Sequence, residues 1–569
     1  MIMNDGLPMV DIRHARPAVA RASGLRAPSP APWRAPRRCR LTTIAAACTL
    51  AAACADGGAG DEPAALAWGG CGDVAPAPFE CAAMPAPLDS TRADGPQVRI
   101  AAIRHPATDR TRRLGTIFFN PGGPGGKGTD DLPAWIGKFP AALRERFDLV
   151  SWDPRGIGRS TAVRCFADKG AEDAFKARFA PGYPVGDAQV RAQAALQAEF
   201  NAGCAARAGA LLAHVSTADT ARDLERLRAA LREPSLNYLG VSYGTLLGAT
   251  YANLYPQRVR AMVLDGNIDP PRYFEDVPLQ GTSLRIRNDL ATARTLADFL
   301  RLCGEAGPAR CDFAGRDAAD TAAKFETLAQ RLAASPVTLP SAPGVPITEP
   351  MMLGLAAGWL FVVEPFDTFP GWKALAGALE QLWRASGGAA AAGSARVASG
   401  SAASGTRTRP VTATATATAG TTDYDSDGAA SAVQCGESPN PRELPMFAQS
   451  AEIAAARAGR IGRWVAWFDS SCAGWPVRAA APHTGPWDRP TAPILVIGNT
   501  FDPSTAYESS QSMAALLSNA RLLTVDGYGH TALLNGSRCA SDAQAAYFID
   551  GALPAPGSRC VQDRRPFEP

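Results

Sequence analysis

The stretch Asn237-Tyr-Leu-Gly-Val-Ser-Tyr-Gly-Thr-Leu-Leu-Gly248 decides how the rest of the chain is interpreted. It places a G-x-S-x-G motif, Gly240 to Gly244, between a short apolar run and a small-residue segment typical of a helix. This context predicts a strand, a sharp turn and a helix, with Ser242 strained at the turn. A side chain at residue 240 or 244 would collide with the adjoining helix and strand. We expect the Ser242 hydroxyl above the sheet edge, over a helix N-terminus that favours negative charge. The alternative is a glycine-rich turn with an incidental serine.

Composition and charge restrict the class of protein. At 569 residues the chain exceeds one ordinary domain, but a large core with an inserted cap accommodates this length. The apolar content of 46% suffices for a sizeable core. The formal net charge is +3, but residues 1–40 alone carry +6, so the remainder carries −3. A nearly neutral body gives no reason to expect nucleic acid as a partner.

The beginning of the chain resembles an export signal. Basic residues from Arg37 lead into a run of small and apolar residues that ends at Cys54 and is too short to span a bilayer. Residues 1–55 are therefore expected to be a leader, and the mature protein to be secreted, periplasmic or attached to the cell envelope. Leu50-Ala-Ala-Ala-Cys54 resembles a lipoprotein box with its leucine one place too far upstream, so a lipid on Cys54 is an open alternative. That lipid is the one membrane attachment we expect.

Ten cysteines follow Cys54, and this even number suggests disulfides in an exported chain. They form no C-x-x-C and no Cys/His cluster at zinc spacing, so we expect neither a metal nor another cofactor. The sequence does not fix the connectivity, although pairing neighbours in order would close five modest loops. The ten are Cys71, Cys81, Cys165, Cys204, Cys303, Cys311, Cys435, Cys472, Cys539 and Cys560.

Strand-like and helix-like segments alternate on both sides of the Ser242 motif. Strands are expected at residues 97–103, 115–119, 147–152, 236–239, 260–264, 493–497 and 520–525. A capping box at Ser216-Thr-Ala-Asp219 starts an amphipathic helix that leads to the Ser242 strand. This alternation indicates an α/β fold with a mostly parallel sheet.

The pattern changes after about residue 270. Helical segments dominate 271–386 and read as a cap inserted between sheet strands. Residues 387–432 are of low complexity, with too few large apolar side chains to offset the entropy of ordering, so we expect a disordered insertion. The core would then consist of residues 68–270 and 433–569, the second part carrying an acid and a base.

The loop Asn120-Pro-Gly-Gly-Pro-Gly-Gly126 directly follows an apolar strand. It has a plain interpretation as a turn and a functional one as a loop that presents a backbone N–H to a reacting oxygen. An oxyanion hole takes one such donor from this kind of loop and the other from the residue after the nucleophile. Gly123, with Gly122 as its competitor, and Tyr243 are the candidates.

The five histidines test the motif sharply. His14 falls in the expected leader, His105 and His214 precede the serine, and His483 precedes the last acid-bearing strand. His530 alone sits in a glycine-flanked loop after a late strand. Asp502, after the preceding strand, is the leading acid, with Asp265 as the competitor. The chain order Ser242, Asp502, His530 matches that of the α/β-hydrolases. In such a triad the imidazole takes the serine proton, the carboxylate fixes its tautomer, and an acyl-enzyme forms.

Several motifs together resemble one family. Phe-Phe-Asn-Pro-Gly-Gly-Pro-Gly-Gly, Trp-Asp-Pro-Arg-Gly-Ile-Gly-Arg-Ser, Leu-Gly-Val-Ser-Tyr-Gly-Thr, Met-Val-Leu-Asp-Gly and Gly-Tyr-Gly-His are similar to motifs of the secreted tripeptidyl aminopeptidases. These are α/β-hydrolases related to proline iminopeptidases and to mycobacterial cell-wall serine hydrolases. The resemblance runs from about Trp68 to Cys560, interrupted by the insertion.

The resemblance implies an exopeptidase that releases short peptides, often tripeptides, from a free N-terminus. It carries the triad onto Ser242, Asp502 and His530, and it suggests neighbour pairing of the cysteines, including Cys435 with Cys472. The chain departs from the family in its insertion. It also has Asn120-Pro121 where proline iminopeptidases have a histidine, which argues against strict proline specificity.

The substrate ammonium needs a carboxylate, since an unpaired buried charge is costly. Glu364 and Glu437 are candidates in or beside the cap, although such a residue is more often a solvated surface charge. A carboxylesterase or lipase with the same triad is the main alternative, and the motif alone does not separate it from a peptidase. A non-catalytic binding protein on the same scaffold would not need Ser242, Asp502 and His530, so the presence of all three argues against it. A haloalkane dehalogenase is disfavoured, because it would have a carboxylate at the position of Ser242.

Overall fold

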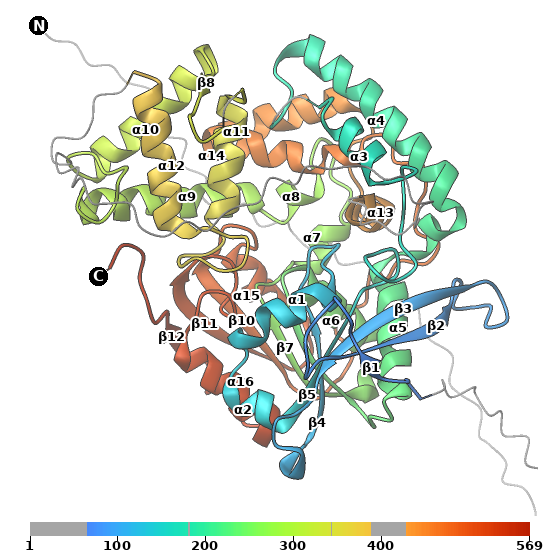
Figure 1. The fold of residues 1–569 in the computed structure, drawn as a ribbon. Helices are drawn as coiled ribbons and strands as arrows, with labels where there is room; N and C mark the ends of the chain where they lie inside the picture. The colour runs from blue at the N-terminus through green and yellow to red at the C-terminus, as the bar shows by residue number, and fades with distance from the viewer. Residues whose placement is uncertain (1–64, 180–181, 343, 388–427, 569) are drawn as a thin grey trace, which may run out of the picture. The chain divides into compact units, whose positions relative to one another are not determined.

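The computed structural model describes residues 65–179, 182–342, 344–387 and 428–568. Through this part of the chain runs a sheet of ten strands in the order β1-β2-β3-β5-β4-β6-β7-β10-β11-β12 (Figure 1). From β5 to β12 every neighbouring pair is parallel, and β1, β2 and β3 extend one side of the sheet with antiparallel pairing. The strands are β1 (Gly69–Gly70), β2 (Glu80–Pro87), β3 (Gln97–His105), β4 (Gly115–Asn120), β5 (Phe147–Trp152), β6 (Leu236–Val241), β7 (Val259–Asp265), β10 (Ile494–Phe501), β11 (Ala520–Tyr528) and β12 (Arg559–Val561). The expected α/β fold with a mostly parallel sheet is confirmed.

The register of the central strands aligns their carboxyl ends. Asn120 at the end of β4 pairs with Gly240 of β6, and Val241 pairs with Asp265 at the end of β7. Asp265 in turn pairs with Ile497 of β10. Parallel strands in register bring the loops that follow them to one edge of the sheet. The glycine-rich loop, the Ser242 turn and the loops after β10 and β11 therefore emerge side by side.

Helices cover both faces of the sheet, because its central strands are apolar on both sides and must be buried on both. On one face lie α5 (Thr217–Ala230), α6 (Tyr243–Leu254) and α15 (Tyr507–Leu516); on the other lie α1 (Gly128–Trp135), α2 (Ala141–Arg146) and α16 (Arg538–Asp550). The predicted capping box forms at the start of α5, where the Ser216 hydroxyl and the Asp219 carboxylate each bond the backbone of the other residue. The helix expected before the Ser242 strand is thus confirmed.

A helical cap lies over the carboxyl edge of the sheet (Figure 1). Besides the two apolar clusters that sandwich the sheet, a third forms largely within one segment, the chain between β7 and β10. Its helices are α7 (Pro270–Phe274), α8 (Thr282–Arg285), α9 (Asn288–Ala306), α10 (Ala318–Ala334), α11 (Glu349–Trp359), α12 (Gly371–Ala385), α13 (Gly428–Glu437) and α14 (Leu444–Phe468), with a short hairpin β8 (Val337–Thr338) and β9 (Pro346–Ile347). Two more helices, α3 (Lys169–Lys176) and α4 (Gly186–Ala208), follow β5, and Val190 of α4 also packs into the cap cluster.

The cap differs from the sequence expectation at its boundaries. Residues 428–432, which we assigned to the insertion, begin α13, whose Ala429, Ala432 and Val433 pack into the cluster on one face of the sheet, and the next strand of the sheet is β10. The buried face of α14 joins the cap cluster, with Leu444, Phe447 and Val465 among its members. Apolar periodicity identifies a helix but not the surface that it packs on, so the assignment of α14 to the core was wrong. The expected leader, Cys54 included, and residues 388–427 lie outside the described residues.

Five disulfides confirm neighbour pairing along the chain. Each joins two half-cystines that are consecutive in the sequence after Cys54. The pairs are Cys71–Cys81, Cys165–Cys204, Cys303–Cys311, Cys435–Cys472 and Cys539–Cys560. The closed loops are short to moderate, so each bridge ties neighbouring elements rather than distant parts of the fold.

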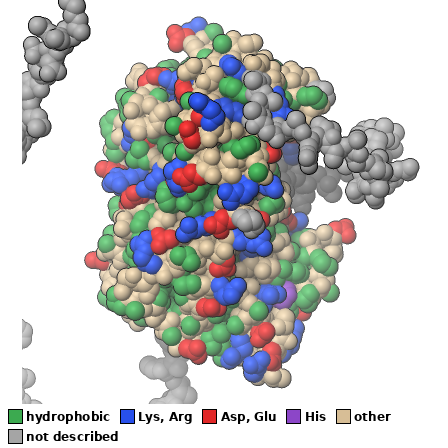
Figure 2. Space-filling view, turned by 90° about the vertical axis from the view of Figure 1, so that its left-hand side faces the viewer, with side chains coloured by type: hydrophobic (Ala, Val, Ile, Leu, Met, Phe, Trp, Pro, Cys, Tyr) green, Lys and Arg blue, Asp and Glu red, His purple; other side chains and the backbone are tan. Residues whose placement is uncertain are grey.

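Acidic and basic side chains are interspersed on the face of the molecule in Figure 2. Elsewhere on the surface, exposed partners form ion pairs, such as Arg178 with Glu199 and Arg301 with Glu305. Such exposed pairs add little to stability. Among the described residues, no helix combines the length and the apolar character needed to cross a membrane.

Candidate active site

The Ser242 motif forms the predicted sharp turn between β6 and α6. Ser242 has φ 58° and ψ −124°, a strained conformation for a residue with a side chain. Its N–H donates to the Asp265 carbonyl at 3.0 Å, which ties the turn to the next strand. A Cβ on Gly240 would lie 2.3 Å from the Gly244 carbonyl oxygen, and one on Gly244 would lie 2.7 Å from the Asn120 carbonyl oxygen. Both glycines are therefore required by close packing, and Ser242 remains half-buried at the bottom of a cavity.

The glycine-rich loop after β4 lies directly against this turn. A Cβ on Gly122, which has φ +96°, would be 2.4 Å from the Val241 carbonyl oxygen. The Gly122 N–H donates to the Asn120 side chain at 3.1 Å. The Gly123 N–H has no acceptor among the described residues, and Gly123 lines the cavity beside Ser242. Tyr243 is the first residue of α6, where backbone N–H groups have no partner within the helix. Of the two competing glycines, Gly123 is thus the one with a free donor at the cavity.

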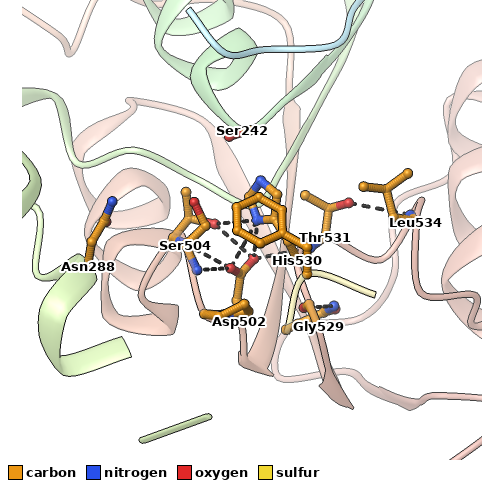
Figure 3. A network of polar contacts seen from close by, with 12 residues as sticks. Ser242, Asn288, Asp502, Ser504, Gly529, His530, Thr531 and Leu534 are labelled. Carbon is orange, nitrogen blue, oxygen red and sulfur yellow. Dashed lines mark hydrogen bonds and ion pairs between the residues drawn. The ribbon is translucent and has the colours of Figure 1, made fainter. Parts of the chain in front are cut away.

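His530 and Asp502 form a buried hydrogen-bonded pair. His530 Nδ1 lies 3.0 Å from both Asp502 carboxylate oxygens. This contact leaves the other ring nitrogen facing Ser242, which lies on the side of the imidazole away from Asp502 (Figure 3). Among the described residues, the structure contains no hydrogen bond between the Ser242 hydroxyl and the ring. Such bonds often tighten only when substrate binds.

The Asp502 carboxylate is held by more than the imidazole. It also accepts from the backbone N–H groups of Ser504, Thr505 and Thr531 and from the Thr505 hydroxyl, at 2.8 to 3.1 Å. Burial opposes ionisation, but the charge and hydrogen bond of His530, together with the backbone donors, hold the pKa of Asp502 below its ordinary value. The acid therefore stays ionised and keeps its orientation.

The competing acid, Asp265, has a different set of contacts. Its carboxylate accepts from the N–H groups of Ala532 at 3.0 Å and Leu533 at 2.8 Å. Burial raises the pKa of Asp265 to about 6, with the neighbouring Asp502 charge adding to the effect. Asp265 therefore anchors the segment that follows His530 instead of contacting the ring.

The other described histidines lie elsewhere. His105, the last residue of β3, packs edge-on against Phe79, and His483 packs against Trp487. His214 contributes its backbone carbonyl to the buried Arg155 guanidinium. None of the three lines the cavity that contains Ser242, whereas His530 does. His14 is outside the described residues.

The cavity between core and cap has a volume of about 440 Å³. Aromatic side chains from both layers form much of its wall: Trp135, Phe361, Phe369, Trp464 and Phe468. Among the described residues that line it, none is Asp, Glu, Lys or Arg; the polar members include Ser283, Asn288 and Gln434. A mostly apolar pocket with a few placed polar groups is typical of a binding site for a small molecule or a short chain.

Neither glutamate proposed for the substrate ammonium lines this cavity. Glu364 is exposed, in the loop between the two aromatic residues Phe361 and Phe369. Glu437 is buried behind the wall, where it accepts from the Thr217 N–H and hydroxyl and from the Tyr273 hydroxyl. Burial raises the pKa of Glu437 to about 7.

Sequence reasoning missed one residue that joins the cap to the loop of the expected base. The Asn535 amide accepts from the Val363 N–H at 2.9 Å and donates to the carbonyls of Phe361 and His530 at 3.0 and 2.9 Å. A Cβ on Gly529 would lie within 2.5 Å of the Asn535 side chain. Gly529, directly before His530, indicates a close approach at this position, but nothing in the sequence identifies Asn535 as the residue that approaches it.

The fold, the strained serine and the buried acid–imidazole pair define the class of this protein as a serine hydrolase of the α/β-hydrolase fold. Comparison with known families agrees. The family of the alpha/beta hydrolase fold matches residues 115–296, and the family of TAP-like proteins matches residues 458–560.

Three relatives extend this similarity over most of the chain. The tripeptidyl aminopeptidase of Streptomyces lividans is 29% identical over 514 residues, which cover 86% of this chain and 85% of that protein. The serine protease Hip1 of Mycobacterium tuberculosis is 29% identical over 84% of this chain and 87% of its own length. Carboxylesterase B of the same organism is 31% identical over 91% of this chain and 95% of its own length. The chain belongs to the tripeptidyl aminopeptidase-like family of α/β-hydrolases.

Proposed function

We propose that the protein is an exported serine exopeptidase that releases short peptides, tripeptides in particular, from the free N-terminus of peptide substrates. The observation that carries the proposal is the Asp502–His530 pair facing Ser242 at the bottom of a cavity that the cap covers. The names of two relatives, a tripeptidyl aminopeptidase and a serine protease, support the choice of peptides as substrates.

In the proposed reaction, Ser242 Oγ attacks the carbonyl carbon of the scissile bond while His530 takes the hydroxyl proton. The N–H groups of Gly123 and Tyr243 stabilise the negative oxygen of the tetrahedral intermediate. His530 then gives its proton to the leaving amine, and an acyl-enzyme remains on Ser242. Water, deprotonated by His530, releases the peptide and restores the serine. Asp502 keeps its charge throughout and stabilises the imidazolium.

The chemistry of the cysteines supports the proposed export. Five disulfides form and persist in an oxidising compartment, whereas the cytosol keeps thiols reduced. We infer that the protein acts outside the cytoplasm, either released or held at the envelope by a lipid on Cys54. Metabolic labelling with a fatty acid, compared between the full chain and Cys54→Ser, separates these two forms.

A substrate comparison tests the proposed activity. The purified protein is offered a tripeptide p-nitroanilide with a free amine, the same compound with an acetylated amine, and a p-nitrophenyl ester. An exopeptidase cleaves the free compound far better than the acetylated one. Turnover of the ester alone would contradict the proposal.

A carboxylesterase is the second candidate, because Carboxylesterase B is 31% identical to this chain and the cavity is largely apolar. An acyl chain fits such walls without any need for a charged partner. If this candidate is correct, kcat/KM rises with the acyl length of the ester, and the peptide compounds are not cleaved.

A further inference from the structure

One wall of the catalytic cavity is backed by a buried carboxylate. Asp469, only 1% exposed, accepts from the Ser283 N–H at 2.7 Å and from the Ser283 hydroxyl at 2.9 Å. Its third donor is Gln434 Nε2 at 2.5 Å. Ser283 and Gln434 line the same cavity as Ser242 and His530, whereas Asp469 stands behind them.

These contacts fix how the wall faces the cavity. Because Gln434 donates its amide N–H to Asp469, its Oε1 is left as an acceptor without a partner among the described residues. Asn288 lies on the cavity wall as well, and its Oδ1 has no hydrogen-bond partner in the described part of the chain. An unpaired buried acceptor is costly unless a ligand supplies the donor. The wall thus offers hydrogen-bond acceptors that a substrate can satisfy.

The charges behind this wall are unbalanced. Asp469 and Glu437 are both buried, and the buried cation of the same region is Arg285. The Arg285 guanidinium donates to three backbone carbonyls and to the hydroxyls of Ser438 and Thr282. Glu437 has only neutral partners. Burial raises the pKa of both carboxyl groups, because the one guanidinium nearby does not offset the loss of solvent. A cation that enters the cavity would favour their ionised forms, and the low local dielectric strengthens that attraction.

We propose that Ser283 and Gln434, which stand in front of Asp469, bind the α-ammonium group of the substrate, with the Asn288 amide oxygen of the same cavity as a further acceptor. This inference rests on the proposed exopeptidase function and names the residues that would select a free N-terminus. An ammonium group brings three N–H donors, which match the acceptor oxygens of Gln434 and Asn288 and the Ser283 hydroxyl. Asp469 balances the charge through Gln434. An acetylated amine has lost both the charge and two of the donors, so the wall disfavours it.

Two variants test the wall by different means. In Asp469→Asn, the new side-chain N–H at residue 469 faces Gln434 and needs an acceptor. The Gln434 amide must therefore turn its oxygen toward residue 469, so that its NH2 group, a donor, faces the cavity. In Gln434→Met the acceptor is lost while the Ser283–Asp469 bonds remain. Glu380→Gln is the matched control, since Glu380 is a buried carboxylate of α12 paired with Lys324 and Arg384, away from the cavity.

The measured quantity is the ratio of kcat/KM for a free tripeptide p-nitroanilide to that for its acetylated form. Both wall variants are expected to lower this ratio by about 10- to 100-fold, mainly through KM for the free compound, because one hydrogen bond to a charged group is lost. Glu380→Gln is expected to keep the ratio of the wild type. A p-nitrophenyl ester and the melting temperature report whether each variant retains its triad and its fold.

The outcomes separate the two proposals. If the wild type prefers the free amine and both wall variants keep that preference, the assignment of the wall is wrong and the exopeptidase function stands. The assignment is also wrong if Glu437→Gln removes the preference and Asp469→Asn does not. If the wild type cleaves only esters, the exopeptidase function fails, and the wall has no ammonium to bind.

Discussion

At the scale of the residue, the chemistry depends on how little freedom Ser242 has. Its positive φ is enforced by glycines 240 and 244, where any Cβ would meet backbone atoms at 2.3 and 2.7 Å. Ser242 lies on the side of the His530 imidazole away from Asp502, where the proposed nucleophile has to be (Figure 3). Strain that the surrounding packing imposes is typical of a pre-organised site.

Replacement of the nucleophile gives the first prediction. Ser242→Ala is expected to lower kcat by about a million-fold, because the variant lacks the hydroxyl that is proposed to attack the scissile carbonyl. The measurement is steady-state turnover of the best p-nitroanilide or ester, with the melting temperature as a check on the fold. Ser518→Ala, which removes an exposed hydroxyl bonded to the Arg489 carbonyl, is the control. Retained turnover in Ser242→Ala would show that the nucleophile is misassigned.

Asp265 leads to a prediction about pH and stability. Its pKa rises from an ordinary 3.8 to about 6 in the folded chain. The protonated form is thus favoured by folding, and the stability it contributes is complete below pH 3.8 and is lost as the pH rises through 6. Asn mimics the protonated form at every pH. The free energy of unfolding of the wild type minus that of Asp265→Asn should therefore fall by about 3 kcal/mol between about pH 3 and pH 8.

Urea unfolding at a series of pH values measures this difference, and the contributions of all other carboxylates cancel in the subtraction. A difference that stays flat with pH would mean that Asp265 ionises in the native state as easily as in the unfolded chain. A difference that rises with pH would mean that the two backbone N–H donors outweigh burial.

At the scale of the element, the sequence predicts those features of the fold and the site that depend on local sterics and on apolar periodicity. The Ser242 turn was predictable because glycines bracket it, and His530 because only five histidines had to be weighed. The residues behind the cavity were not predictable. Asp469 and Gln434 come from segments on either side of α14, and only the packed cap brings them together. Glu437 was a candidate substrate ligand because it lies in or beside the cap. Its actual partners, Thr217 and Tyr273, lie far away in the sequence, so the sequence does not show that they bind it.

The contact between the cap and the loop of the base gives a prediction at this scale. Asn535→Ala is expected to lower kcat/KM by about 10- to 100-fold, because the carbonyl of His530 and the N–H of Val363 lose their common partner. The loss of stability should be about 1–3 kcal/mol. Turnover and thermal unfolding are measured together.

Asn253→Ala is the matched control for that variant. The buried Asn253 amide likewise bridges two backbone groups, the Ala249 carbonyl and the Arg489 N–H, but far from the cavity. Its loss should lower the melting temperature without changing kcat/KM. If both variants affect only stability, Asn535 has a structural role alone.

At the scale of the whole molecule, each disulfide joins elements that are near each other in the sequence. The Cys435–Cys472 bridge closes a loop with a sequence separation of 37, which includes the whole of α14. It also flanks the cavity wall, since Gln434 precedes one half-cystine and Asp469 lies three residues before the other. The Cys71–Cys81 bridge, with a separation of 10, lies at the edge of the sheet beyond β3.

Removing each bridge by a pair of serines therefore separates stability from function. Chain entropy predicts a loss of about 4 kcal/mol for the Cys435–Cys472 pair and about 3 kcal/mol for the Cys71–Cys81 pair, because the longer loop restricts the unfolded chain more. Urea unfolding measures both. Only the first pair should also raise KM for a free tripeptide, since only this bridge holds the wall that Gln434 and Asp469 form. An equal rise in KM for the two pairs would mean that the wall depends on overall stability and not on the bridge beside it.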